Sequence, residues 1–189
     1  MKRKMLLVFG IFLLLCFVFM ACDNSTGGES TSTFILQSSA FKNNQRLAEK
    51  YCYTGVSGGQ NISLPFSWTG APDNTQSFAL VLYDPEGGDW IHWAVFNIPP
   101  KCSSIPEKAS GTANMPAGCV ELTNDFGSPG YGGPEPPPGS GTHHYIATLY
   151  ALNVDSIPGL SGNKSYQEIT TLLAGKVIDK AIITGTYSR

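Results

Sequence analysis

The chain has 189 residues and a formal net charge of −2, and only 14% of its side chains are charged. A chain of this length fits one domain, and the absence of a Lys/Arg-rich run argues against nucleic acid as a partner. The many glycines and prolines, together with 11% aromatic residues, favour a compact β-rich fold with ordered loops.

The N-terminal segment has the features of an export signal. Basic residues at positions 2–4 precede an uncharged run from Met5 to Ala21, and the chain becomes polar directly after Cys22. The run is slightly shorter than the roughly 20 apolar residues that span a bilayer. Its end, Phe-Met-Ala-Cys at 19–22, resembles the lipobox of bacterial lipoproteins, although Phe19 stands where leucine is usual.

We therefore expect residues 1–21 to be a lipoprotein signal peptide and Cys22 to carry the lipid that anchors the protein to a bacterial membrane. Residues 22–32 are small and polar, which is typical of a flexible tether, and 33–189 would form the folded domain. An uncleaved membrane anchor and ordinary secretion are the alternatives. In each case the domain is expected outside the cytoplasm, and the lipid anchor would hold it in the cell envelope.

Hydrophobic patterns along the domain predict mainly strands and one helix. The strand candidates are 33–37, 61–64, 77–83, 91–98, 144–152 and 181–187. Both alternating faces of 77–83 are apolar, as expected of a strand covered on two sides. A helix should begin after Ser165, which forms a capping box with Glu168. Its apolar face would comprise Ile169, Leu172, Leu173 and Val177.

Three cysteines remain in the predicted domain, Cys52, Cys102 and Cys119, and the compartment outside the cytoplasm permits disulfides. Cys102 and Cys119 enclose a segment with little apolar surface, within a Pro- and Gly-rich stretch at 99–142 that we interpret as a folded functional loop. A Cys102–Cys119 disulfide would fix this segment and leave Cys52 as the free thiol.

Three polar residues stand on or beside apolar strands. Asp84 follows the strand at 77–83, and His92 and His143 share strand faces with apolar residues. A histidine among apolar side chains is costly unless it is hydrogen-bonded or lies at a pocket. Each residue alone is more often structural. Together with the loop GSPGYGGPEPPPGSG, which leads to His143, they indicate one shared pocket.

Four motifs follow one another along the chain: LVLYDPE, HWAVFNIP, GYGGPEPP and GTHHYIATLYAL. In this order they resemble the phosphatidylethanolamine-binding protein family, which includes Raf kinase inhibitor protein and its bacterial relatives. The likeness extends over about residues 33–189. It implies a mainly β fold, an antiparallel two-sheet sandwich with a few peripheral helices.

The family has a small surface pocket for phosphate, acetate or a phospho-headgroup, and the resemblance implies the same pocket here. Its ligand-binding residues would be Asp84, His92, His143, Tyr145, Glu135, Pro136 and Pro137. Two neighbours depart from the family motifs, since Glu86 replaces an aspartate and His144 replaces an arginine. A histidine N–H can donate to a phosphate oxygen, and protonation of His92 or His143 at acidic pH would add positive charge.

The sequence thus predicts a membrane-anchored, non-enzymatic protein that binds a small anionic or phosphorylated ligand without a cofactor. Inhibition or docking of another envelope protein is the alternative, and a homodimer stays open. A serine hydrolase is less favoured, because GVSGG at 55–59 lacks the strand–turn–helix context of a nucleophile elbow. Adjacent His143 and His144 point to opposite faces of a strand, so no metal site is expected.

The lipobox-like junction leads to a direct prediction. Cys22→Ser should leave a precursor that incorporates no labelled fatty acid, because acylation needs the cysteine thiol at this position. Metabolic labelling of the wild type and the variant measures the difference. Equal incorporation of label into both proteins would contradict the lipoprotein assignment.

Overall fold

The structure, a computed structural model, describes residues 33–189. The predicted signal peptide, the lipid site at Cys22 and the tether at 22–32 lie outside these residues. Within the described domain, no helix is both long enough and apolar enough to cross a membrane.

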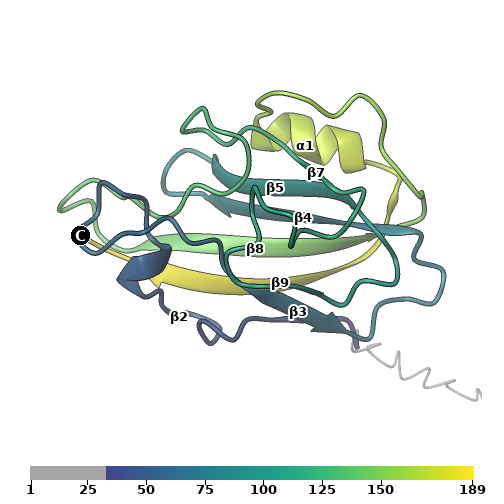
Figure 1. Cartoon of the computed structure of the whole chain (residues 1–189), viewed down its shortest axis with the longest axis horizontal. Coiled ribbons are helices and arrows are strands. Elements are labelled where there is room, and N and C mark those ends of the chain that lie inside the picture. The colour runs from purple at the N-terminus through teal and green to yellow at the C-terminus, as the bar shows by residue number, and fades with distance from the viewer. Residues whose placement is uncertain (1–32) are drawn as a thin grey trace, which may run out of the picture. The chain divides into compact units, whose positions relative to one another are not determined.

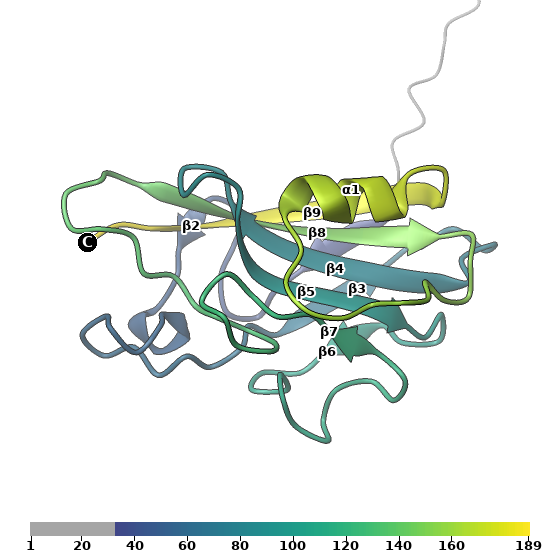
Figure 2. The same ribbon diagram turned by 90° about the horizontal axis from the view of Figure 1, so that it is seen from above.

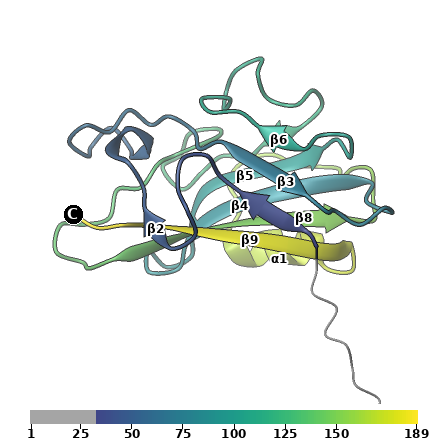
Figure 3. The same cartoon turned by 90° about the horizontal axis from the view of Figure 1, so that it is seen from below.

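The domain is built in three layers (Figures 1 and 2). The middle layer is a six-stranded sheet in the order β2 (Gln45–Arg46), β9 (Val177–Tyr187), β8 (His143–Leu152), β4 (Ser77–Asp84), β5 (Trp90–Ile98) and β7 (Val120–Glu121). One of its faces is covered by a three-stranded sheet, also visible in Figure 3, of β1 (Ile35–Gln37), β3 (Phe66–Thr69) and β6 (Ser104–Ile105). The helix α1 (Tyr166–Leu173) covers the other face, and a short 3₁₀ helix, η1 (Glu49–Tyr51), precedes β3 in the chain.

The strand pairs of the two sheets are antiparallel with one exception. The short β2 runs parallel to β9, through the pairs Gln45–Gly185 and Arg46–Thr186. The predicted two-sheet sandwich is therefore confirmed, but its larger sheet is mixed. β8 pairs with both β4 and β9 along most of its length. This pairing brings the end of β4 beside the beginning of β8, where the candidate site lies.

The central strand β4 is apolar on both faces because each face is covered. Leu80 and Leu82 belong to the core between the two sheets, whereas Ala79 and Val81 belong to the core beneath α1. All four residues are fully buried. Burial of a Val or Leu side chain contributes about 1.5–3 kcal/mol, so a strand buried on both sides is a strong anchor for the residues at its ends. The prediction of a two-sided strand at 77–83 is confirmed.

One predicted strand is wrong. No strand forms at 61–64, because Asn61 has a φ of 53°, in the left-handed region, which interrupts an extended chain. The strand begins instead at Phe66, directly after Pro65, and alternates buried and exposed side chains as it pairs with β1 and β6.

The predicted helix is present and begins where expected. The Ser165 side chain accepts from the backbone N–H of Glu168, and the Glu168 side chain accepts from the backbone N–H of Ser165. The helix is shorter than its apolar pattern suggested. It ends at Leu173, and Gly175, with a φ of 72°, turns the chain. Val177 therefore begins β9 instead of extending the helical face.

The three cysteines of the domain are unbonded, so the predicted Cys102–Cys119 disulfide is not formed in this structure. The two thiols are nevertheless neighbours. Burial, with added effects from the charges of Glu121 and Cys102, raises the pKa of Cys119 to about 11. Both side chains pack against the core between the sheets.

A carboxylate fixes the segment that the disulfide was expected to fix. Glu121 accepts hydrogen bonds from Trp93 Nε1 at 2.7 Å and from the backbone N–H of Gly111 at 2.8 Å. It also accepts from the Ser110 hydroxyl, whose oxygen in turn accepts from the backbone N–H of Tyr131 at 2.8 Å. One side chain thus joins the core, the segment between the two cysteines and the loop that follows it, and a disulfide is not needed for this purpose.

We expect Glu121→Ala to lower the free energy of unfolding by at least about 2 kcal/mol, because the buried Trp93 N–H loses its acceptor. Urea denaturation measures the change, and Glu49→Ala, which removes an exposed carboxylate, is the control with little effect. A reducing agent should leave the wild-type midpoint unchanged. A midpoint that falls on reduction would show that the cysteines do form a stabilising bridge.

Candidate functional site

A pocket of about 320 Å³ lies at the ends of β4, β5 and β8. It is lined by Asp84, Gly87, Trp90, His92, Phe126, Glu135, Pro136, Pro137, His143 and Tyr145. The structure therefore brings all seven sequence-predicted site residues into one pocket. Their role as ligand contacts stays a prediction.

Sequence reasoning missed Trp90, Phe126 and Ser140, which contribute to the pocket or to its hydrogen bonds. Trp90 precedes His92 by two residues on β5 and so shares its strand face, a signal that was available. Phe126 and Ser140 lie in irregular loop, where residue spacing does not specify the direction of a side chain.

Asp84 ends β4, and a tight turn after it fixes its carboxylate. The backbone N–H of Gly87 donates to Asp84 Oδ1 at 3.0 Å. A Cβ at Gly87 would come within 3.2 Å of both Asp84 Oδ2 and the Trp90 side chain. Glycine therefore lets the turn pass close to both residues, and Asp89, with a φ of 60°, completes it.

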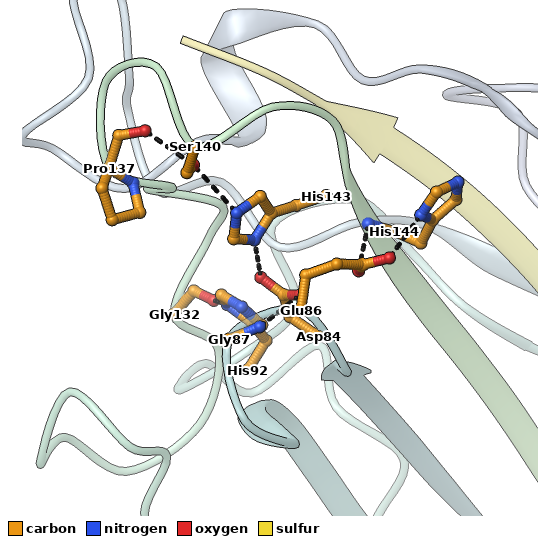
Figure 4. A network of polar contacts seen from close by, with 9 residues as sticks. All are labelled: Asp84, Glu86, Gly87, His92, Gly132, Pro137, Ser140, His143 and His144. Atoms are coloured by element: carbon orange, nitrogen blue, oxygen red, sulfur yellow. Dashed lines mark hydrogen bonds and ion pairs between the residues drawn. The ribbon is translucent and has the colours of Figure 1, made fainter.

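The carboxylate of Asp84 meets His143 inside the domain (Figure 4). Asp84 Oδ2 lies 2.6 Å from His143 Nδ1, and the two side chains are 5% and 6% exposed. On the other side of the imidazole ring, His143 Nε2 lies 2.9 Å from Ser140 Oγ. The Ser140 hydroxyl donates to the carbonyl oxygen of Pro137 at 2.7 Å. One chain of hydrogen bonds thus joins β4, β8 and the Pro-rich loop.

Ser140 and Asp84 contact the two nitrogens of the His143 ring. The Pro137 carbonyl can only accept, so it takes the single hydroxyl proton of Ser140. Ser140 Oγ can then accept from His143 Nε2, and His143 Nδ1 faces Asp84 Oδ2. Both nitrogens of His143 are already hydrogen-bonded within the protein, so His143 supports the pocket wall and has no free N–H for a ligand.

His92 lies on β5, with its ring between aromatic neighbours. Its Nδ1 lies 2.6 Å from the carbonyl oxygen of Gly132 and must donate to it. The ring centroid is 5.1 Å from that of Tyr145 and 5.8 Å from that of Phe126. Burial lowers the pKa of His92 to about 4, against the opposing effects of the Gly132 carbonyl and Asp84. His92 is therefore neutral at mildly acidic pH, which corrects the expectation that its protonation adds charge there.

Two hydrogen-bond donors on the pocket wall are buried without a partner in the described domain: Trp90 Nε1 and the Tyr145 hydroxyl. Tyr145 is 1% exposed, and burial raises the pKa of its hydroxyl, so the group keeps its proton and stays a donor. A buried donor without an acceptor costs about 1–3 kcal/mol, and proteins contain few of them. Trp90 and Tyr145 both line the pocket, so a ligand with acceptor oxygens is a candidate partner for these two groups.

The loop that forms the outer wall of the pocket is tightly held. Phe126 stacks on Tyr53, with ring centroids 4.1 Å apart and an interplanar angle of 4°. The backbone N–H of Gly133 donates to Asn61 Oδ1 at 2.7 Å. A Cβ at Gly133 would lie 2.1 Å from the carbonyl oxygen of Tyr51, so only glycine allows so close an approach. This part of the 99–142 stretch is a folded loop, as interpreted from the sequence.

His144 lies on the other face of β8, away from the pocket (Figure 4). Its ring Nδ1 and its backbone N lie 2.8 Å and 2.9 Å from the two carboxylate oxygens of Glu86. The two residues that depart from the family motifs therefore pair with each other and tie the turn after β4 to β8. The prediction that His143 and His144 point to opposite faces is confirmed. Within residues 33–189, no three His, Cys, Asp or Glu side chains are grouped so as to hold a metal ion.

Comparison with known proteins establishes the family. The sequence profile of the phosphatidylethanolamine-binding protein family matches residues 37–188, so the chain belongs to this family. A UPF0098 protein of Methanothermobacter thermautotrophicus is 36% identical over 156 residues, which are 82% of this chain and 98% of that protein. LppC of Mycobacterium tuberculosis, provisionally named as a lipoprotein, is 37% identical over 133 residues, which are 68% of this chain and 61% of LppC.

Solved structures agree with this assignment. The crystal structure of Escherichia coli YbcL, described as a new member of the mammalian family, superposes with a TM-score of 0.77 at 34% identity. The match covers 83% of this chain and 99% of that chain. CT736 of Chlamydia trachomatis, described as a homologue of the family, superposes with a TM-score of 0.70 at 30% identity, covering 84% and 99%.

The lowered pKa of His92 predicts how stability depends on pH. The folded domain holds this residue neutral down to a pKa of about 4, whereas the unfolded chain takes up the proton near the ordinary value of 6.5. The free energy of unfolding should therefore fall as the pH decreases from about 6.5 to about 4, by up to roughly 3 kcal/mol from this residue. At lower pH both states are protonated, and this contribution becomes constant.

Urea denaturation over this pH range measures the slope. His92→Gln cannot be protonated and should lose this part of the pH dependence, whereas His144→Gln, at an exposed position, should retain it. An unchanged slope in His92→Gln would contradict the assignment of a buried neutral imidazole.

Proposed function

We propose that the domain is a binding protein of the bacterial cell envelope that holds a small anionic or phosphorylated ligand in the pocket around Asp84 and His143. The observation that supports this most strongly is the pair of unpartnered donors, Trp90 Nε1–H and the Tyr145 hydroxyl. Both belong to the pocket wall, and only acceptor atoms can satisfy them. The oxygens of phosphate, of a carboxylate and of a phospho-headgroup are such acceptors.

The size and the other walls of the pocket limit the ligand further. A volume of about 320 Å³ is at the small end of the range for ligand pockets, roughly 300–1,000 Å³. Phe126, Pro136 and Pro137 add apolar surface to the wall. The pocket therefore suits a headgroup-sized molecule with a short apolar part better than a whole lipid.

We further propose that the pocket binds its ligand without catalysis. Ser140, His143 and Asp84 are connected in the order of a serine-hydrolase triad, but the Ser140 hydroxyl donates to Pro137 and accepts from His143. In this arrangement the histidine does not act as a base toward the serine, which is what activates a nucleophile. Ser57 of the GVSGG segment lies among turns between η1 and β3, and the next element along the chain is a strand, not the helix that an elbow requires.

Attachment to the membrane is part of the proposal. It is supported by the lipobox-like sequence that ends at Cys22 and by the similarity to LppC, which bears a provisional lipoprotein name. Each buried CH₂ of an acyl chain contributes roughly 0.8 kcal/mol, so two or three chains on one cysteine would hold the domain stably at a membrane.

Calorimetric titration with inorganic phosphate at neutral pH tests the role of the unpartnered donors. Tyr145→Phe removes the donor and keeps the ring, and it should weaken binding by about threefold to tenfold, as expected for one hydrogen bond. Tyr150→Phe is the matched control, because Tyr150 is also buried but belongs to the core beneath α1. Equal affinities of the wild type and Tyr145→Phe would mean that the hydroxyl does not meet the ligand.

The neighbouring histidines give a second test of the same pocket. His143→Ala should weaken phosphate binding by about tenfold or more, because the charge of Asp84 would then lie uncompensated in the wall. His144→Ala should have a much smaller effect, since its side chain leaves β8 on the other face. Circular dichroism checks that each variant is folded. A larger loss of phosphate affinity in His144→Ala than in His143→Ala would show that the pocket has been assigned to the wrong face of β8.

A further inference from the structure

The described residues that line the pocket include no lysine or arginine. Its ionisable residues are Asp84, His92, Glu135, His143 and Tyr145, and Tyr145 keeps its proton because burial raises the pKa of its hydroxyl. Asp84 is paired with His143 at 2.6 Å, and His92 is neutral because burial lowers its pKa to about 4. Glu135 therefore leaves the wall with a net negative charge. By itself this charge would repel the anion for which the other residues provide donors.

Arg189 is placed to compensate this charge. Its Nη1 lies 3.5 Å from Glu135 Oε1, and the two side chains are 28% and 26% exposed. A hydrogen bond between a guanidinium and a carboxylate is normally about 2.7–2.9 Å long, so this contact is loose. A guanidinium has five N–H donors in a planar fork, and the contact with Glu135 occupies one of its nitrogens.

The backbone keeps Arg189 at the edge of the pocket. The N–H of Gly139 donates to the backbone oxygen of Arg189 at 3.2 Å. Tyr187, two residues earlier, is the partner of His143 in the β8–β9 pair. Figure 2 shows the end of the chain beside the loop that leads from the Pro-rich segment into β8. The backbone of Arg189 is thus attached to the same loop that supplies Pro137 and Ser140.

We propose that Arg189 is the cationic subsite of the pocket. When an oxyanion binds, the guanidinium leaves Glu135 and donates two N–H groups to the ligand, which favours a dianionic phosphoryl group over a monocarboxylate. Glu135 competes for the guanidinium and holds it while the pocket is empty. This inference rests on the proposed function and adds to it the residue that selects the charge of the ligand.

Arg46 offers a control, because it has the same charge and contacts Tyr187 and Ser188, the two residues before Arg189. Its guanidinium lies 4.1 Å from the centroid of the Tyr187 ring. It also donates to the backbone oxygen of Ser188 at 3.1 Å and lies 3.4 Å from Glu49. These contacts hold Arg46 away from the residues that line the pocket. Its removal changes the net charge of the domain by the same amount as removal of Arg189, without removing the proposed contact to the ligand.

The test is calorimetric titration of inorganic phosphate and, separately, of acetate into the folded domain at neutral pH and constant ionic strength. Arg189→Gln should weaken phosphate binding by about tenfold, as expected for a charged hydrogen bond, and acetate binding by less. Arg46→Gln should change either affinity by no more than about twofold. Glu135→Gln should tighten phosphate binding several-fold, because Arg189 loses its competitor.

The double variant separates a direct contact from simple charge compensation. In the Glu135→Gln background, Arg189→Gln should still weaken phosphate binding by about tenfold, because the guanidinium touches the ligand. No effect in that background would mean that Arg189 only neutralises Glu135, and the subsite would be rejected. Arg189→Lys keeps the charge without the fork and should recover part of the affinity. It also serves as the second variant if Arg189→Gln does not fold.

Failure of the subsite and failure of the proposed function give different results. A folded wild-type domain that binds neither phosphate nor acetate would overturn the proposed function itself. A wild type that binds phosphate but loses equal affinity in Arg189→Gln and Arg46→Gln would leave the proposed function standing and overturn the subsite. Thermal unfolding followed by circular dichroism confirms the fold of each variant.

Discussion

The candidate site depends on the contact between Asp84 and His143. The two residues are 59 positions apart in the sequence, and the antiparallel pairing of β4 with β8 brings them together. A carboxylate in a side chain that is only 5% exposed is costly unless it is paired and hydrogen-bonded. His143 supplies the pairing, and the backbone of Gly87 supplies a further hydrogen bond. The turn after β4, the beginning of β8 and the loop around Ser140 are all held in place through this one contact.

The electrostatic character of the pocket follows from this arrangement. Beside the paired Asp84 and His143 lie two uncharged donors, Trp90 Nε1–H and the Tyr145 hydroxyl, whose rings are held by aromatic packing. The ring of Trp90 lies edge-on to Phe126, with centroids 5.4 Å apart, and Tyr145 packs in the same manner against His92. Donors that are already oriented lose little freedom when a ligand binds. If the pocket binds a ligand as proposed, we expect such a wall to discriminate by the geometry of the ligand's acceptors, with Glu135 and Arg189 adding charge at the edge.

The sequence predicted the structure best in segments that are both buried and part of a family motif. β4 and β8 are long and apolar and carry family motifs, so their positions and the pocket residues at their ends could be predicted. The short strands β2, β6 and β7 could not, because two residues show no periodicity. The strand predicted at 61–64 was misplaced, because the backbone of Asn61 adopts a left-handed conformation that the apolar pattern does not reveal. The role of Glu121 could not be predicted either, because its three partners, Trp93, Ser110 and Gly111, lie 28, 11 and 10 residues away in the sequence.

The exposed pair of Glu86 and His144 has a consequence for how this family varies. The family motifs place an aspartate and an arginine at these two positions, a short acid with a long base. This chain has a long acid with a short base, and the two side chains still meet, at 2.8 Å. The two differences thus compensate each other in length, and an acidic side chain still meets a basic one. Positions 86 and 144 should therefore covary among relatives, so that a glutamate at the first accompanies a histidine at the second, and the mixed combinations are rare.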